Sequence, residues 1–153
     1  MTDLAVRRAT LADLPAIVAM LADDHLGATR EGAPDDPAYA TAFAEIDADP
    51  HQRLVVGELD GEVIATMQLT IIPGIGRKGA RRALIEAVRV RSDRRGGGLG
   101  KQLIGWAIET ARTENCAMVQ LTSDKSRTDA HRFYDQLGFT QSHVGYKLAL
   151  PQR

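Results

Sequence analysis

Residues 88–114 read VRVRSDRRGGGLGKQLIGWAIETARTE, and this stretch decides the fold. A β-branched run leads into a basic, glycine-rich turn, and apolar residues at helical spacing follow it. Gly96, Gly97 and Gly98, with Gly100 just beyond, leave the main chain without Cβ atoms, so that successive N–H groups can converge on an anion. The N-terminus of the following helix adds its partial positive charge there. The stretch therefore predicts a phosphate-binding strand–turn–helix.

Three cations surround this turn, namely Arg94, Arg95 and Lys101. They suit a ligand with several phosphates better than a ligand with a single carboxylate. The alternative is an ordinary helix entry with a solvated charge cluster. That alternative is disfavoured because four glycines in five positions would cost backbone entropy with no gain.

Spacing narrows the class of phosphate ligand. A nucleotide P-loop needs a glycine five residues before Gly100 and a Ser or Thr after Lys101, but Arg95 and Gln102 stand there. A dinucleotide fingerprint needs its last glycine where Lys101 stands. The turn therefore matches neither nucleotide pattern.

Two motifs carry a resemblance to a known family. The pattern Arg95-x-x-Gly98-x-Gly100 resembles motif A of the GNAT superfamily of acyl-CoA-dependent N-acetyltransferases, and residues 130–139 (AHRFYDQLGF) resemble its motif B. Residues 7–17 are similar to the opening of many members. The resemblance implies that the turn holds the pyrophosphate of acetyl-CoA. The residues implied at the pyrophosphate are Arg95, Gly96, Gly97, Gly98, Leu99, Gly100 and Lys101.

The resemblance also implies a place for the pantetheine arm, in a gap between two strands that splay apart after motif A. The backbone of Val88, Arg89 and Val90 is expected to bind the arm, and an N–H near Val88 is expected to polarise the thioester carbonyl. Many members carry an asparagine where this chain has Arg127, and Ser123, Lys125 and Ser126 are the nearby candidates to replace that contact.

The order of predicted elements gives the fold class. Strands are expected at residues 5–8, 54–59, 63–72, 83–91, 118–122 and 144–150, and the Asp60-Gly61 pair predicts a hairpin. Helices follow Thr10, Pro37, Gly98 and Thr128. This order predicts one mixed α/β domain over residues 1–153. Its mostly antiparallel sheet carries helices on both faces and splayed strands at the acyl-CoA site, as in GNAT folds.

Acyl transfer to an amine needs a proton for the departing thiolate and a base for the amine. The resemblance to motif B places Tyr134 beside the sulfur, and a phenol with a pKa of about 10 keeps its proton at neutral pH. A helix aromatic that merely packs is the alternative. Glu86 is the expected base, since it interrupts an apolar strand and would share a face with Leu84, Val88 and Val90. An edge glutamate paired with an arginine is its alternative.

Composition bounds the remaining possibilities. With 153 residues, one cysteine and a net charge of −1, the chain fits one cytoplasmic domain and not a broadly basic nucleic-acid surface. The sequence has no apolar run that could span a bilayer and no leader pattern. The four histidines show no metal spacing. Cys116 lacks an obvious activating base, which favours direct attack over an acyl-enzyme.

The predicted function is an N-acetyltransferase that uses acetyl-CoA and a small-molecule or peptide amine. A catalytically silent acyl-CoA-binding module and a nucleotide-binding protein are the alternatives. The basic loop at residues 77–82 either steers an acidic acceptor or lies at a subunit interface, and the interface is preferred. A homodimer is expected by analogy with similar proteins. The sequence leaves the acceptor amine open.

Overall fold

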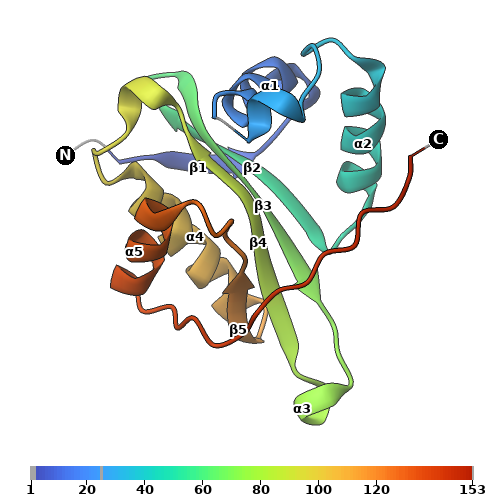
Figure 1. The fold of residues 1–153 in the computed structure, drawn as a ribbon, viewed down its shortest axis with the longest axis vertical. Helices are drawn as coiled ribbons and strands as arrows, with labels where there is room; N and C mark the ends of the chain where they lie inside the picture. The colour runs from blue at the N-terminus through green and yellow to red at the C-terminus, as the bar shows by residue number, and fades with distance from the viewer. Residues whose placement is uncertain (1–2, 25, 153) are drawn as a thin grey trace. The chain divides into compact units, whose positions relative to one another are not determined.

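The computed structural model describes residues 3–24 and 26–152 and divides into two compact units, one up to Leu121 and one from Thr122 onward. The first unit holds a twisted sheet with helices beside it (Figure 1). The single-domain organisation stays a prediction. Within the described ranges, no helix has the length and apolar character needed to cross a membrane.

The sheet has five strands in the order β1-β2-β3-β4-β5. The first four pair antiparallel and β5 runs parallel to β4, so the predicted mixed sheet is confirmed. Asp60 and Gly61 take positive φ angles of 52° and 79° in the β2–β3 turn, as a tight hairpin requires. The strands are β1 (Ala5–Arg8), β2 (Gln52–Leu59), β3 (Glu62–Ile72), β4 (Arg81–Val90) and β5 (Cys116–Leu121).

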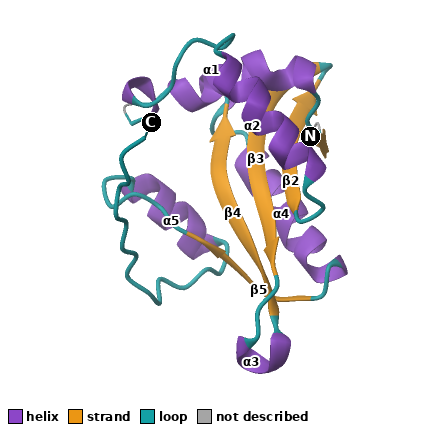
Figure 2. Ribbon diagram, turned by 90° about the vertical axis from the view of Figure 1, so that its right-hand side faces the viewer, coloured by secondary structure: helices purple, strands orange, loops and turns teal. Residues whose placement is uncertain are grey.

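Helices cover both faces of this sheet, as predicted (Figure 2). α1 (Leu14–Ala22) and α2 (Pro37–Ala48) lie on one face, and α4 (Leu99–Thr113) packs on the other. The apolar stripe of α4 is buried through Leu103, Ile104 and Ala107, none of which is exposed. The short helix α3 (Gly76–Gly79) lies in the connection between β3 and β4. The 3₁₀ turns among the described residues of this unit are η1 (Leu11–Asp13), η2 (Gly27–Thr29) and η3 (Ser92–Arg94).

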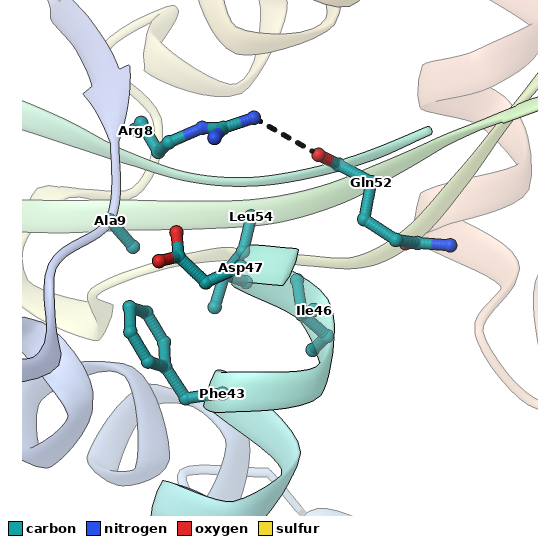
Figure 3. Close-up of a pocket in the computed structure, with 7 residues that line it drawn as sticks. All are labelled: Arg8, Ala9, Phe43, Ile46, Asp47, Gln52 and Leu54. Atoms are coloured by element: carbon teal, nitrogen blue, oxygen red, sulfur yellow. Dashed lines mark hydrogen bonds between the residues drawn. The ribbon is translucent and has the colours of Figure 1, made fainter. Parts of the chain in front are cut away.

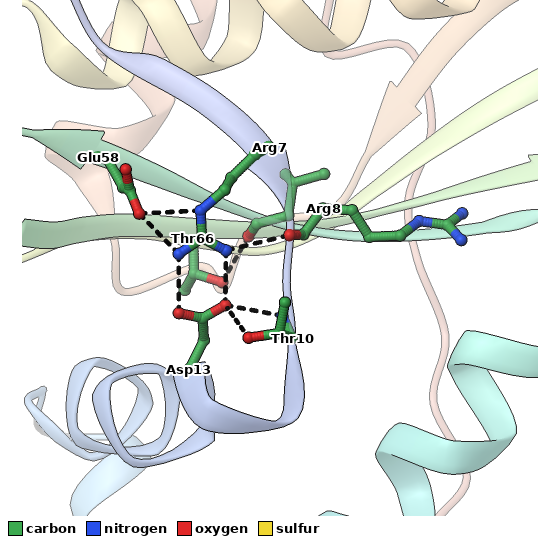
Figure 4. A network of polar contacts seen from close by, with 7 residues as sticks. Arg7, Arg8, Thr10, Asp13, Glu58 and Thr66 are labelled. Carbon is green, nitrogen blue, oxygen red and sulfur yellow. Dashed lines mark hydrogen bonds and ion pairs between the residues drawn. The ribbon is translucent and has the colours of Figure 1, made fainter. Parts of the chain in front are cut away.

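A charged network joins β1 to the first helical turn (Figure 4). The guanidinium of Arg7 donates to both carboxylate oxygens of Asp13, at 2.7 and 3.0 Å, and to Glu58 on β2 at 2.7 Å. The backbone N–H of Thr10 donates to Asp13 at 2.7 Å, which closes a capping box. The hydrogen bonds from Arg7, helped by those from Thr10, lower the pKa of the buried Asp13 from 3.8 to about 2.

The second unit contains α5 (Thr128–Gln136) and an irregular C-terminal segment. The strand predicted at residues 144–150 is wrong, because the structure assigns no strand there. Apolar residues do alternate, but Val144, Tyr146, Leu148 and Leu150 are all exposed. Alternation marks the two faces of a strand only when a neighbouring strand supplies hydrogen bonds, and the described residues pair none with this segment.

We predict that Asp13→Asn destabilises the protein by about 1–3 kcal/mol at pH 7, because it removes a charged acceptor from the Arg7 network. A folded-state pKa below the unfolded value stabilises the fold above about pH 4, and this stabilisation is lost as the pH falls toward 2. Urea unfolding at pH 7, 4, 3 and 2 should therefore show the gap between wild type and variant shrinking with acidity.

The matched control is Asp35→Asn, which changes an exposed loop carboxylate. It should leave the free energy of unfolding within about 0.5 kcal/mol of wild type at every pH. An Asp13→Asn gap that stays constant from pH 7 to pH 2 would contradict the role of this carboxylate.

Candidate active site

A bulge interrupts β4 at the centre of the sheet. Arg89 pairs with Thr66 and Glu86 pairs with Gln68, so Ala87 and Val88 stand opposite a single residue of β3. The strand takes up the extra residue at Ala87, whose backbone lies in the left-handed region. Its φ of 54° is uncommon for a residue with a Cβ. The bulge lies within the stretch that the sequence assigns to the pantetheine arm.

The bulge changes which side chains share a face. Paired residues point to the same side of a sheet, so Glu86 and Arg89 lie on the face of Gln68 and Thr66. Val90 pairs with Ala65 and points to the other face. The expectation that Glu86 shares a face with Val90 is therefore wrong, since uniform alternation does not survive an inserted residue. Glu86 is exposed and lies on the same face as Arg89.

The end of β4 extends beyond its parallel neighbour. The β4–β5 ladder ends at the pair Ile85–Leu121, and β4 continues for five more residues, 86–90. Val88, Arg89 and Val90 are half-buried and lie beyond the end of this ladder, and side chains of Arg89 and Arg95 donate to the carbonyls of Val88 and Val90. The part of a strand that extends beyond its neighbour can accept an extended ligand as an added strand.

The glycine turn has the conformation that its sequence requires. Gly96 and Gly98 take φ angles of 86° and 79°, and Gly98 is the N-cap of α4. A Cβ placed at either glycine would meet no protein atom within 4 Å, so the space beside the turn is open to a ligand. Left-handed backbone at a helix N-terminus directs N–H groups outward, as a pyrophosphate needs. The turn therefore fits the phosphates of coenzyme A.

The cations around this turn differ in availability. Arg95 and Lys101 are exposed, and Arg95 donates to the carbonyl of Val90 at 3.2 Å. Arg94 lies 3.9 Å from Glu62, which partly offsets its charge. Leu99 is an apolar residue of α4 and is buried. Gly97 is exposed, and Gly100 is half-buried. Arg95 and Lys101 are thus the better placed pair for an anionic ligand.

The remaining predicted site residues belong to the second unit. Tyr134 is half-buried on α5, with edge-on ring contacts to Phe133 and Phe139 at centroid distances of 5.2 and 5.7 Å. The hydroxyl of Ser126 donates to Asp124 at 2.7 Å. The catalytic role of Tyr134 and the coenzyme contact of Ser126 therefore stay predictions.

Cys116 is a half-buried thiol at the start of β5. Burial raises its pKa above the ordinary value, so the thiol stays protonated at neutral pH. A protonated thiol is a poor nucleophile, in agreement with direct transfer to the amine.

One polar group near Glu86 escaped the sequence reasoning. The side-chain oxygen of Gln52 accepts hydrogen bonds from Gln68, at 2.8 Å, and from Thr70, at 3.0 Å. These residues share the face of Glu86, because Gln68 pairs with it directly. Polar residues at alternate positions of the otherwise apolar β3 were the available signal.

A small pocket lies between α2 and the first two strands (Figure 3). This pocket has an apolar floor formed by Phe43, Ile46 and Leu54, and Arg8 donates to the carbonyl of Gln52 at its rim, at 3.3 Å. It contains none of the predicted site residues and is too small for a substrate.

Comparison with known proteins identifies the family. Residues 16–139 match the model of the acetyltransferase (GNAT) family. The chain belongs to the GNAT family of acetyltransferases. It is therefore an acyltransferase, and its fold is that of the GNAT family.

Individual relatives agree with this assignment. The GNAT chain is 30% identical over 151 residues to the aminoalkylphosphonate N-acetyltransferase of Salmonella typhimurium, covering 95% of this chain and 90% of that one. It is 37% identical over 79 residues to the glucosamine 6-phosphate N-acetyltransferase of Trypanosoma brucei brucei, covering 52% of each. A solved structure titled as a transcriptional regulator from Bacillus halodurans C-125 superposes with a TM-score of 0.93, at 45% identity, covering 96% of this chain and 99% of that one.

Metal ligands are not gathered in the part of this GNAT chain that the structure describes. Residues 3–24 and 26–152 contain no group of three or more His, Cys, Asp or Glu side chains that could hold an ion.

We predict that Gly98→Ala raises the dissociation constant for coenzyme A by about tenfold or more, since a Cβ disfavours the left-handed backbone that presents the N–H groups. Isothermal titration with coenzyme A measures the effect. Gly105→Ala, inside α4 where a Cβ meets nothing within 4 Å, is the control. It should bind coenzyme A as wild type does. Equal affinities of Gly98→Ala and Gly105→Ala would show that this turn does not bind the phosphates.

Proposed function

We propose that this protein transfers the acetyl group of acetyl-CoA directly to the primary amine of a small molecule. The observation that carries the proposal is the left-handed Gly98 at the N-terminus of α4, in a chain of the acetyltransferase family. Gly98 leaves open space where the resemblance to motif A expects a pyrophosphate. The end of β4 next to this turn extends beyond the β4–β5 ladder, which supports the same assignment.

The binding of acetyl-CoA is divided between two segments of the first unit. Arg95, Lys101 and the glycine turn would hold the pyrophosphate through backbone N–H groups and two exposed cations. Backbone groups of Val88 and Val90 would bind the pantetheine amides. When bound, acetyl-CoA supplies an activated acyl carbon with a thiolate as leaving group.

The residues of this chain would then handle one proton at each end of the reaction. Glu86, exposed on its strand, accepts a proton from the amine, directly or through water. The amine nitrogen forms a bond to the acyl carbon while a backbone N–H near Val88 stabilises the oxyanion. The carbon–sulfur bond breaks, the phenol of Tyr134 gives its proton to the thiolate, and the nitrogen releases its remaining extra proton to the phenolate or to water, which leaves a neutral amide.

The names of the relatives suggest where to look for the acceptor. One relative is an aminoalkylphosphonate N-acetyltransferase and another is a glucosamine 6-phosphate N-acetyltransferase. Both names denote a small molecule that carries a primary amine and an anionic phosphorus group. We therefore take this class as the first acceptor to assay.

The half-buried Cys116 suits a reducing cytoplasm, and a homodimer is proposed by analogy.

We predict that Tyr134→Phe lowers kcat by about a hundredfold or more and leaves the affinity for coenzyme A unchanged, because it removes the proton donor and keeps the ring. The assay is thiol release from acetyl-CoA with aminoalkylphosphonates, glucosamine 6-phosphate, amino acids and a lysine peptide. A full rate in Tyr134→Phe would remove this residue from the mechanism. Coenzyme A binding without release for any amine would favour a silent acyl-CoA-binding module.

We predict that Glu86→Gln also lowers kcat/KM by at least about a hundredfold at neutral pH, with partial recovery at high pH, where the amine loses its proton to solvent. Cys116→Ser is the matched control, since a direct transfer does not use the thiol. It should retain the wild-type rate, and its inactivation would indicate an acyl-enzyme. The pH–rate profile of kcat/KM separates these cases.

A further inference from the structure

The segment that follows α1 is organised by one carboxylate, that of Asp24. One of its oxygens accepts the backbone N–H groups of Leu26, at 2.9 Å, and Gly27. Its other oxygen lies 3.2 Å from the Nε of Arg89 on β4. The same side chain therefore shapes the turn and joins it to the bulged strand.

The turn accepts little variation. A Cβ at Gly27 would lie 1.8 Å from the carbonyl oxygen of Leu21 in α1, which is far closer than any real contact. The turn is thus packed against the end of its own helix. Asp24 and Gly27 together determine where the chain goes after α1, and residues 26–36 follow from that point.

The partner side chain comes from the bulge. The Nη1 of Arg89 donates to the carbonyl of Val88 at 2.9 Å, so the guanidinium contacts both the loop and the bulge. The register places Arg89 on the face of Glu86. The ion pair therefore joins the segment after α1 to the face of the sheet that carries the proposed base.

Burial makes this pair informative. The side chains of Arg89 and Asp24 are only 17% and 13% exposed. Two charges withdrawn from water gain little net stability, because desolvation offsets their attraction, although loss of one partner is costly. What such a pair adds is an attraction between two segments that are distant in the chain, and this attraction is weakly screened because both charges are buried.

We propose that the Asp24–Arg89 ion pair is a positioning device that fixes residues 26–36 over the Glu86 face and thereby sets the affinity for the acceptor amine. The inference rests on the proposed function for its kinetic consequence only. Its structural part, that the pair holds this segment against β4, stands without any turnover. Asp24 and Arg89 are positioning residues, since they act through the loop and the bulge.

Asparagine at position 24 separates the two tasks of the carboxylate. Asp24→Asn keeps an oxygen that accepts the N–H groups of Leu26 and Gly27 but removes the charge that faces Arg89. Asp24→Ala removes both. Asp23→Asn is the matched control, because Asp23 is next to Asp24 in the chain and its own carboxylate is exposed. Arg89→Lys keeps the charge and removes the planar fork.

In Asp24→Asn we expect the KM for the acceptor to rise about tenfold or more, while the KM for acetyl-CoA stays within about twofold and kcat changes less than the acceptor KM. Asp24→Ala should exceed this effect, Arg89→Lys should be intermediate, and Asp23→Asn should match wild type. A purely structural role would instead reduce the active fraction and leave both KM values unchanged. Equal KM values in Asp24→Asn and wild type would overturn the proposal.

Hydrogen exchange decides the structural part independently of activity. Peptides from residues 26–36 should exchange about tenfold faster in Asp24→Asn than in Asp23→Asn, with unchanged protection of β2 and β3. Unchanged exchange of residues 26–36 would overturn the positioning role. If no amine is acetylated by wild type, the proposed function fails, and faster exchange of this segment still supports the pair as its anchor.

Discussion

The bulge at Ala87 determines which side chains of β4 lie on the face of the sheet that carries Glu86. One extra residue in β4 brings Glu86 and Arg89 to the same side of the sheet, although three positions separate them. The same insertion turns Val90 toward the face that α4 covers. A regular strand would place Glu86 and Arg89 on opposite faces, and the ion pair with Asp24 would be out of reach of the proposed base.

Local chemistry explains which parts of the fold could be read from the sequence. Asp60-Gly61 specifies its hairpin through two positive φ angles, and Gly98 followed by an apolar stripe specifies α4, whose predicted and observed starts agree. The bulge at Ala87 has no such signature. It depends on how β4 aligns with β3, and alanine is a poor indicator of left-handed backbone. The alternation of residues along the strand was therefore not enough to predict on which faces Glu86 and Val90 lie.

The sequence also could not predict which charged side chains from distant segments contact one another. Gly96 and Gly98 reveal the left-handed conformation of the turn before α4, because glycine is the residue type that adopts it readily. Arg94 and Arg95 look equivalent in the sequence, but Glu62 from another strand lies near only one of them. Likewise, nothing local to Asp24 indicates that its carboxylate meets Arg89, 65 positions further on. Contacts between distant segments have no sequence pattern of their own.

Gly27 has a consequence for how acceptor choice can change in descendants of this protein. Because any side chain there collides with the backbone of α1, this position is closed to mutational drift. Ala28, Thr29 and Arg30, which follow it, are exposed. Under the positioning role proposed for this segment, substitutions that change the acceptor preference are expected after Gly27, so a randomised library should begin at Ala28 and keep the glycine.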